Sequence, residues 1–314
     1  MLAYALQRIA LALLICAVAI TALISIIHII PGDPVNIVLG PRATQEMRDA
    51  YRREMGMDKP VPLQIVHFLG KAAIGDLGKD MWSKRPVVTV VAETLPFTLT
   101  LIAAGLGWAV LLGVPLGCYS AVRRNSAIDK ITGVISVGTI SMPTFVVAIY
   151  AMLIFAVMLK WFPAIGAGEP GDIGDQLHHL VLPAFAMGLV WVGYLARLVR
   201  ASMLEVMGEQ HVRTARAFGL RERSIVFRYA LRIAILPTIT LISLAFGSLL
   251  SSAVFIEVIF ARPGIGKLVV NAVGFRNYPI VMGSVFMTVL LFAFGTMLAD
   301  LLIARLDPRV RSSL

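Results

Sequence analysis

Residues 94–122 read TLPFTLTLIAAGLGWAVLLGVPLGCYSAV, a run of 29 residues that contains no Asp, Glu, Lys or Arg. A helix needs about 20 such residues to cross the roughly 30 Å of hydrocarbon in a membrane. Inside lipid, the backbone must satisfy its own hydrogen bonds, which favours a helix. Buried strands of soluble proteins are shorter, about four to eight residues. The run therefore predicts a membrane-spanning helix.

Five more stretches of similar length also lack charged residues: 9–32, 131–159, 176–196, 233–256 and 277–299. Of the 314 residues, 58% are hydrophobic and only 15% are charged. Soluble domains carry about 25% charged residues, so this composition argues against a soluble enzyme. We expect an all-α polytopic membrane protein with six transmembrane helices. The first run is too long for a signal peptide and lacks a small-residue cleavage site, so we expect it to stay as an anchor.

Positive charges in the segments between the runs set the expected orientation. One set of segments carries fifteen: Arg8, then Arg123, Arg124 and Lys130, then eight arginines between 197 and 232, then Arg305, Arg309 and Arg311. In the long 31–93 segment, by contrast, nine positive charges are balanced by eight acidic residues. Because Lys and Arg accumulate on the cytoplasmic side, we expect both termini in the cytoplasm. The net charge of +10 then reflects topology, and we expect no nucleic-acid partner.

This topology divides the chain into four parts. They are an N-terminal transmembrane helix 1–30, a periplasmic insertion 31–93, a transmembrane core 94–306 with a cytoplasmic loop 201–235, and a cytoplasmic tail 307–314. The insertion is expected to be helical, because Thr44 can cap a helix that Gly56 ends. A second amphipathic stretch follows Pro60, and Gly75–Gly78 resembles a turn.

Within the runs, two features predict helix packing. Gly113 and Gly117 are four residues apart and permit close helix approach. Pro143 should kink the third span near its middle. Cys16 and Cys118 both lie in spans, where we expect them to pack as small apolar residues.

Several short patterns imitate chemical sites. Gly166–Gly171 matches a dinucleotide fingerprint but lacks the required strand and helix. Pro263–Lys267 resembles the end of a phosphate loop, but Leu268 occupies the magnesium-binding position. His178 and His179 are adjacent and so would point in different directions on a helix. We therefore expect no catalytic residue, no metal site and no cofactor in this chain.

The cytoplasmic loop holds the most distinctive stretch, residues 211–220, HVRTARAFGL. Small residues and arginines precede Gly219, a typical helix end. Such a short helix could insert into a groove on another protein. Its arginines could equally bind anionic lipid, and composition alone does not separate these two interpretations.

This stretch resembles the EAA loop of ABC-importer permeases, in particular the dipeptide and oligopeptide branch. In the general pattern Glu-Ala-Ala precedes a glycine; here Arg213-Thr214-Ala215 precede Gly219. The Leu-Pro that usually follows is Leu231-Arg232 in this chain, with Leu236-Pro237 five residues later. The peptide branch is similar to this variant form.

The resemblance extends over nearly the whole chain. Its motifs are Pro31-Gly32-Asp33-Pro34, Met55-Gly56-Met57-Asp58-Lys59-Pro60, Gly75-Asp76-Leu77-Gly78, Arg85-Pro86-Val87, Ser141-Met142-Pro143-Thr144-Phe145, the run from Ala253 to Phe260, Pro263-Gly264-Ile265-Gly266 and Tyr278-Pro279. Ser252 and Asn277 depart from the branch, where Gly and Asp are expected.

The resemblance implies a type I ABC importer permease fold and an inner-membrane transport subunit that is not itself an enzyme. It implies a heterodimer with a sister permease, two ATPase subunits that hold ATP and Mg, and a periplasmic substrate-binding protein. The implied coupling contacts to the ATPase are Arg213, Thr214, Ala215, Arg216, Ala217 and Gly219. Candidate pathway or gate residues are Ser141, Met142, Pro143, Ser251, Ser252 and Glu257.

Two rival functions remain open from the sequence. An ion-coupled secondary transporter would need Glu257 or Asp300 to bind its ion. A structural membrane subunit would need no transport residue. Substrate identity also stays open, because the same branch resembles importers for peptides, nickel and glutathione.

Overall fold

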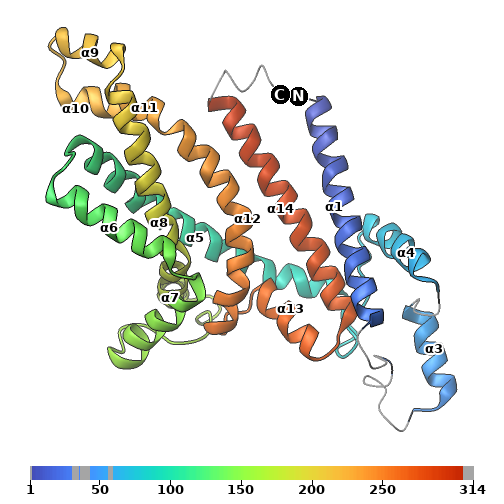
Figure 1. The fold of residues 1–314 in the computed structure, drawn as a ribbon. Helices are drawn as coiled ribbons and strands as arrows, with labels where there is room; N and C mark the ends of the chain where they lie inside the picture. The colour runs from blue at the N-terminus through green and yellow to red at the C-terminus, as the bar shows by residue number, and fades with distance from the viewer. Residues whose placement is uncertain (1, 30–34, 36–42, 56–58, 307–314) are drawn as a thin grey trace. The chain divides into compact units, whose positions relative to one another are not determined.

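The structure of the chain is a computed structural model that describes residues 2–29, 35, 43–55 and 59–306. The regular structure of these residues is helical, and an isolated bridge joins Lys79 to Pro86. The chain forms two compact units (Figure 1). Unit 1 comprises Met1–Pro96 and Pro263–Phe294, and unit 2 comprises Phe97–Arg262 and Gly295–Leu314.

Long apolar helices make up nearly half of the chain. They are α1 (Leu2–Ile29), α5 (Val87–Val122), α8 (Ile173–Met207), α12 (Leu236–Ile259) and α14 (Tyr278–Leu306). All five are long and apolar enough to cross a membrane, and a bent helix pair makes a sixth if it counts as one span. The all-α membrane fold that the sequence predicts is confirmed.

The helices extend beyond the charge-free runs that predicted them. Helix α5 begins at Val87 rather than at residue 94, and its 36 residues correspond to about 54 Å. This length exceeds the hydrocarbon thickness, so α5 must tilt strongly or extend past the hydrocarbon core. A charge-free run marks the apolar part of a helix, and the helix itself continues through Glu93.

The third predicted span is broken at the proline that was expected to kink it. Helix α6 (Ala127–Ser141) is followed by α7 (Thr144–Ala151) and the π-helix η1 (Met152–Met158), and the two halves meet at 103°. Pro143 precedes α7 with φ −59° and ψ 137°, which is outside the helical region. Proline has no N–H to donate and disfavours a helical residue before it. The break therefore falls at Met142 and Pro143.

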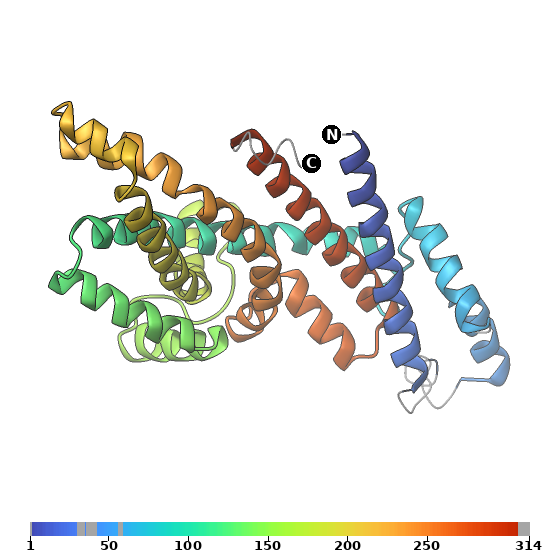
Figure 2. The ribbon, with the colours of Figure 1, turned by 45° about the horizontal axis from the view of Figure 1, so that its top comes forward.

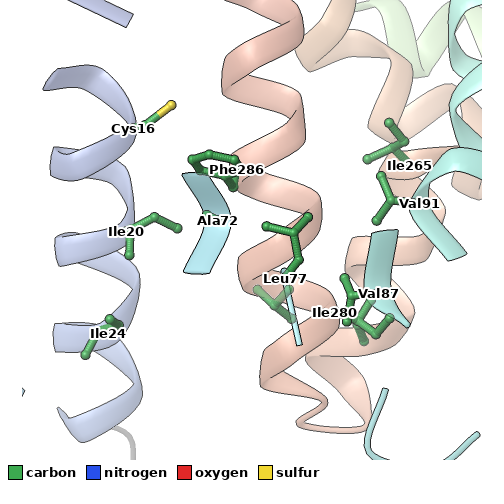
Figure 3. Packing of buried hydrophobic residues seen from close by; sticks show 12 residues of the cluster. Cys16, Ile20, Ile24, Ala72, Leu77, Val87, Val91, Ile265, Ile280 and Phe286 are labelled. Carbon is green, nitrogen blue, oxygen red and sulfur yellow. The ribbon is translucent and has the colours of Figure 1, made fainter. Parts of the chain in front are cut away.

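Unit 1 has its own apolar core (Figure 3). Helix α1 contributes Cys16, Ile20 and Ile24, and Phe286 of α14 belongs to the same cluster. The cluster also receives side chains from α4 (Val61–Ala73), from the start of α5 and from α13 (Ile265–Gly274). Cys16 is 1% exposed and Cys118, in unit 2, is 4% exposed. Both thiols are free, and both pack as the sequence predicts.

The two helices expected between residues 44 and 73 are present. Helix α3 (Gln45–Met55) begins after Thr44, whose Oγ1 accepts a hydrogen bond from the backbone N–H of Met47 at 3.3 Å. The expected stop at Gly56, the motif residues 31–34 and 57–58, and the tail 307–314 lie outside the described residues.

A turn that joins α4 to α5 is fixed by side-chain hydrogen bonds. Gly75 and Gly78 have φ values of 82° and 84°, which glycine adopts without strain. The Asp80 carboxylate accepts hydrogen bonds from the backbone N–H groups of Trp82 and Ser83, and from the Asn277 side chain. Burial alone would raise the pKa of Asp80, but these hydrogen bonds outweigh it and hold the pKa below its ordinary value.

Unit 2 is organised around α8, which packs against α5, α6, α7 and α12 (Figures 1 and 2). Glycines allow these close contacts. A Cβ on Gly113 of α5 would lie 2.8 Å from the Leu195 Cβ of α8, and one on Gly117 would lie 2.8 Å from the Val199 Cβ. Gly193 of α8 similarly leaves room for the Ser136 carbonyl of α6, which a Cβ would meet at 2.9 Å. Gly113 and Gly117 thus have the close-packing role that their spacing predicts.

Candidate functional site

The arginine-rich segment after α8 folds into a short helix and a tight turn. Helix α9 covers Gln210–Ala217, and Phe218 follows it. Gly219 has φ +72°, a left-handed conformation that ends the helix and that glycine tolerates best. The short helix predicted at 211–220 is confirmed, together with its glycine stop. In both ribbon views α9 lies at one end of unit 2, and α7 lies toward the other (Figures 1 and 2).

The two faces of α9 differ sharply. Val212 is fully buried and Ala215, three residues later on the same face, is 6% exposed. Both pack in a cluster with Val199 and Met203 of α8 and with Ile225 of η2 (Ile225–Ala230). The remaining residues proposed for coupling are exposed, namely Arg213, Thr214, Arg216, Ala217 and Gly219.

This arrangement gives Ala215 a different position from the other predicted coupling residues. The sequence placed it among the residues that contact another protein, because small residues give a low profile. Its methyl group is buried within this chain, so a larger side chain would have to displace the cluster beneath it and would shift α9. Direct contact of Ala215 with a partner stays a prediction.

Two ion pairs fix the segments of unit 2 near α9 and at the start of α6. Arg216 Nε donates a hydrogen bond to Glu222 Oε1 at 2.8 Å, which joins α9 to α10 (Glu222–Ser224). At the start of α6, Asp129 is only 5% exposed and forms an ion pair with Arg200 of α8. Arg200 Nη2 donates to Asp129 Oδ2 at 2.8 Å, and the Asn125 N–H donates to the same oxygen at 2.9 Å.

Sequence reasoning missed the Asp129–Arg200 pair. Ser126 caps α6, and its Oγ accepts a hydrogen bond from the Asp129 N–H at 3.2 Å. A Ser followed three residues later by an acidic residue is a recognisable capping pattern, so the start of α6 was open to prediction. The partner of the carboxylate was not, because Arg200 lies 71 residues further along the chain.

The candidate pathway residues are carried by the helix break and by α12, and α7, which follows the break, packs against α12. The Phe145 ring at the start of α7 lies 6.1 Å from the Phe255 ring of α12, centroid to centroid. Ser141, Met142 and Pro143 are exposed at the break, and Ser251 is exposed on α12. Each serine hydroxyl donates to a carbonyl of its own helix, Ser141 at 2.9 Å and Ser251 at 3.3 Å. Ser252 does the same at 2.9 Å and is half-buried.

Glu257 does not belong with these exposed residues. It is fully buried, and Thr98 Oγ1 of α5 donates to its carboxylate at 2.6 Å. Arg262 is only 4% exposed, and its backbone N–H donates to the backbone carbonyl of Glu257 at 2.8 Å. The Arg262 guanidinium also lies over the Phe97 ring, 5.6 Å from its centroid. Glu257 therefore joins α12 to α5 inside the chain, and its role in a pathway or gate stays a prediction.

The patterns that imitate chemical sites have structural surroundings of their own. Gly166–Gly171 lies in a loop between η1 and α8, where Gly166 N donates to the Phe260 carbonyl at 2.8 Å. His179 Nδ1 lies 3.2 Å from the Asp175 carboxylate, and His178 Nε2 lies 3.1 Å from the Trp161 carbonyl. Among the described residues no group of three His, Cys, Asp or Glu side chains is placed to hold a metal ion.

Comparisons with known proteins agree with this architecture. The family model described as "binding-protein-dependent transport system inner membrane component" matches residues 113–312, and its N-terminal companion model matches residues 1–102. A putative peptide permease of Brucella suis biovar 1 is 38% identical, with 99% of each chain covered. The glutathione transport system permease protein GsiC of Pectobacterium atrosepticum is 37% identical, with 91% of each chain covered.

A solved structure of the MetNI methionine ABC transporter, in an inward-facing conformation, shares the fold. Its TM-score is 0.58 at 16% identity, and the match covers 69% of this chain and 96% of that one. The matched models cover most of the chain, and the curated relatives match it nearly end to end. The chain therefore belongs to the family of inner membrane components of binding-protein-dependent transport systems, as a permease subunit of an ABC importer.

Proposed function

We propose that this chain is one half of a heterodimeric permease that imports peptides or a similar small solute, using ATP hydrolysed by two separate ATPase subunits. A periplasmic binding protein delivers the solute to the outer side. Both termini and the loop 201–235 face the cytoplasm, while residues 31–93 face the periplasm. The distribution of Lys and Arg between the two sets of loops supports this orientation.

The observation that carries the proposal is the two-sided construction of α9. Val212 and Ala215 fix its inner face to α8, so a displacement of α9 is passed to a helix long enough to cross the membrane. Its outer face presents Arg213, Thr214 and Ala217 to the surroundings. A rigid element of this kind can transmit movement from an ATPase to the pathway. It explains how the chain can be driven by ATP that a partner binds.

The ion-coupled alternative is not favoured. Glu257 is fully buried and accepts a hydrogen bond from Thr98, so it does not offer an open ion site. The side chain of Asp300 lies outside the described residues. The family to which the chain belongs also consists of binding-protein-dependent systems.

The substrate class rests on the relatives, two of which are named for peptides and for glutathione. Glutathione is itself a tripeptide, so a peptide-like solute covers both names. Uptake of labelled dipeptide, glutathione and nickel ion by the reconstituted complex with its own binding protein would separate the candidates. We expect uptake of a peptide-like solute, and uptake of nickel alone would contradict this part of the proposal.

A bulky residue on the exposed face of α9 tests the coupling role. Ala217→Trp adds its ring outside this chain, so we expect normal membrane insertion and stability. We expect it to abolish capture of the ATPase subunits and ATP-driven uptake, because the ring would occupy the space of the partner. Ala73→Trp is a matched control, since Ala73 is an exposed alanine at the end of α4. Normal uptake by Ala217→Trp, or uptake by this chain alone without ATP, would refute the proposal.

A further inference from the structure

Phe218 is the most exposed aromatic side chain in the segment that surrounds α9. It is 81% exposed, compared with 64% for Phe227. Moving a side chain of this size out of water is worth about 1.5–3 kcal/mol. Single exposed apolar residues are common on protein surfaces, however, so exposure alone does not identify a contact.

Phe218 differs from an ordinary exposed residue because its turn is held rigidly. Three backbone hydrogen bonds close that turn: Phe218 N to Thr214 O at 3.0 Å, Gly219 N to Arg216 O at 2.9 Å and Leu220 N to Ala215 O at 3.3 Å. The Arg216–Glu222 ion pair spans the same turn. An aromatic ring presented on a fixed backbone loses little conformational freedom when it binds, which is typical of an interface anchor.

Arginines flank Phe218 in the sequence on both sides. Arg213, Arg221 and Arg223 are all exposed, on α9 and on the chain that follows Gly219. A surface of this kind is complementary to an apolar pocket with carboxylates at its rim.

We propose that Phe218 is the hydrophobic anchor that seats α9 in an apolar, acid-rimmed pocket of the ATPase subunit. This inference rests on the proposed function and names the chemistry of its contact. The construction of α9 favours a protein pocket over a lipid surface. A helix that lies on a membrane needs a continuous apolar face, but Val212 and Ala215, the apolar face of α9, are buried inside this chain.

The test is a titration of purified ATPase subunits onto the full permease heterodimer in lipid nanodiscs. We expect Phe218→Ala to weaken binding about 10- to 100-fold, the range of a hot-spot residue. Phe218→Leu keeps an apolar side chain and should stay within about threefold of the wild type. Phe227→Ala is the matched control, an exposed phenylalanine in the same loop, and should change binding less than about twofold.

The acidic rim is tested in the same titration. Arg221→Glu should weaken binding about tenfold, and added salt should weaken the wild type more than this variant, because screening acts on attraction that the variant has lost. Equal salt dependence of the two would contradict an acidic rim.

Two outcomes would overturn the anchor. Binding of Phe218→Ala at wild-type strength would do so, as would a defect seen only in nanodiscs that contain anionic lipid, which would assign Phe218 to the membrane. Failure of the underlying function is distinguishable, because Ala217→Trp would then also capture the ATPase. Loss of capture by Ala217→Trp with normal capture by Phe218→Ala would refute only the anchor.

Discussion

Helices α8 and α12 are both long and apolar, yet this chain covers them to different extents. Half of the apolar stretch of α8 is buried, compared with 29% for α12. Helix α8 meets glycines of α5 and supplies glycines of its own, so backbones approach closely. Helix α12 keeps an exposed stripe along one face: Thr240, Leu244, Ser248, Ser251 and Phe255. The contacts of α8 are made largely within the chain, whereas one face of α12 remains available to a second chain or to the pathway.

The largest effect is expected from a substitution that pushes α5 and α8 apart. We expect Gly117→Val to destabilise the chain by about 3 kcal/mol, the upper end of ordinary overpacking. The added atoms would meet the Ala196 carbonyl, which is backbone and cannot rotate away, and the Val199 side chain. The measurement is denaturant unfolding in detergent micelles followed by circular dichroism.

Gly107 on the same helix is the matched control. A Cβ there would meet nothing within 4 Å, so Gly107→Val should cost less than about 1 kcal/mol. Equal losses at the two positions would show that glycine matters in α5 for a reason other than contact with α8.

The second prediction concerns the ion pair between Asp129 of α6 and Arg200 of α8. Asp129→Asn removes the charge that faces Arg200, and we expect it to lower the free energy of unfolding by about 2 kcal/mol. A fully buried pair would cost more to break, but the Arg200 side chain is 33% exposed and water can replace part of the interaction. The double variant with Asp129→Arg and Arg200→Asp should recover part of the loss. No recovery would show that the Asn125 hydrogen bond, rather than the ion pair, gives Asp129 its importance.

The sequence predicted the apolar parts of these helices but not their ends. A charge-free run indicates which residues can lie in the hydrocarbon core of the membrane. The run that begins at residue 94 therefore did not predict that α5 is helical from Val87. The four-residue spacing of Gly113 and Gly117 predicted a close contact, because only a missing Cβ allows it. It did not identify α8 as the partner, since helix pairing depends on contacts between distant residues.

In the candidate site, too, features that depend on local sequence were predictable, and features that depend on distant residues were not. Gly219 ends α9 as expected, because a left-handed residue at a helix end favours glycine. The burial of Ala215 was not predictable, since alanine is common on both faces of a helix. For Pro143, local chemistry predicted a disturbance, but the 103° angle depends on how α7 packs on α8 and α12. The burial of Glu257 likewise depends on Thr98, a residue 159 positions away.

The third prediction tests how α12 is joined to α5. Thr98→Val keeps the shape of the side chain but removes the hydroxyl that donates to Glu257. We expect it to lower the free energy of unfolding by about 1–2 kcal/mol, because the buried Glu257 carboxylate loses one hydrogen-bond donor. Thr94→Val on the same helix is the control, since the Thr94 hydroxyl donates to the local Val91 carbonyl at 3.0 Å. A loss at Thr94 as large as that at Thr98 would show that the link to α12 contributes nothing specific.

The smallest change in the unfolding free energy of the isolated chain is expected for a substitution on the exposed stripe of α12. A substitution there can affect transport without affecting stability. Ser251→Leu should change the free energy of unfolding by less than about 0.5 kcal/mol, because the side chain is exposed and its hydroxyl donates to a carbonyl one turn back in its own helix. Ala253→Leu, two residues away at a position 1% exposed, should cost about 1–3 kcal/mol through overpacking. In the assembled importer we expect the opposite order when uptake is measured per folded complex. Ser251→Leu should reduce uptake more than Ala253→Leu, because the added leucine would fill space that we assign to the sister permease or to the solute. Normal uptake by Ser251→Leu would mean that this face of α12 meets only lipid, and the contrast between the two helices would then be one of packing alone.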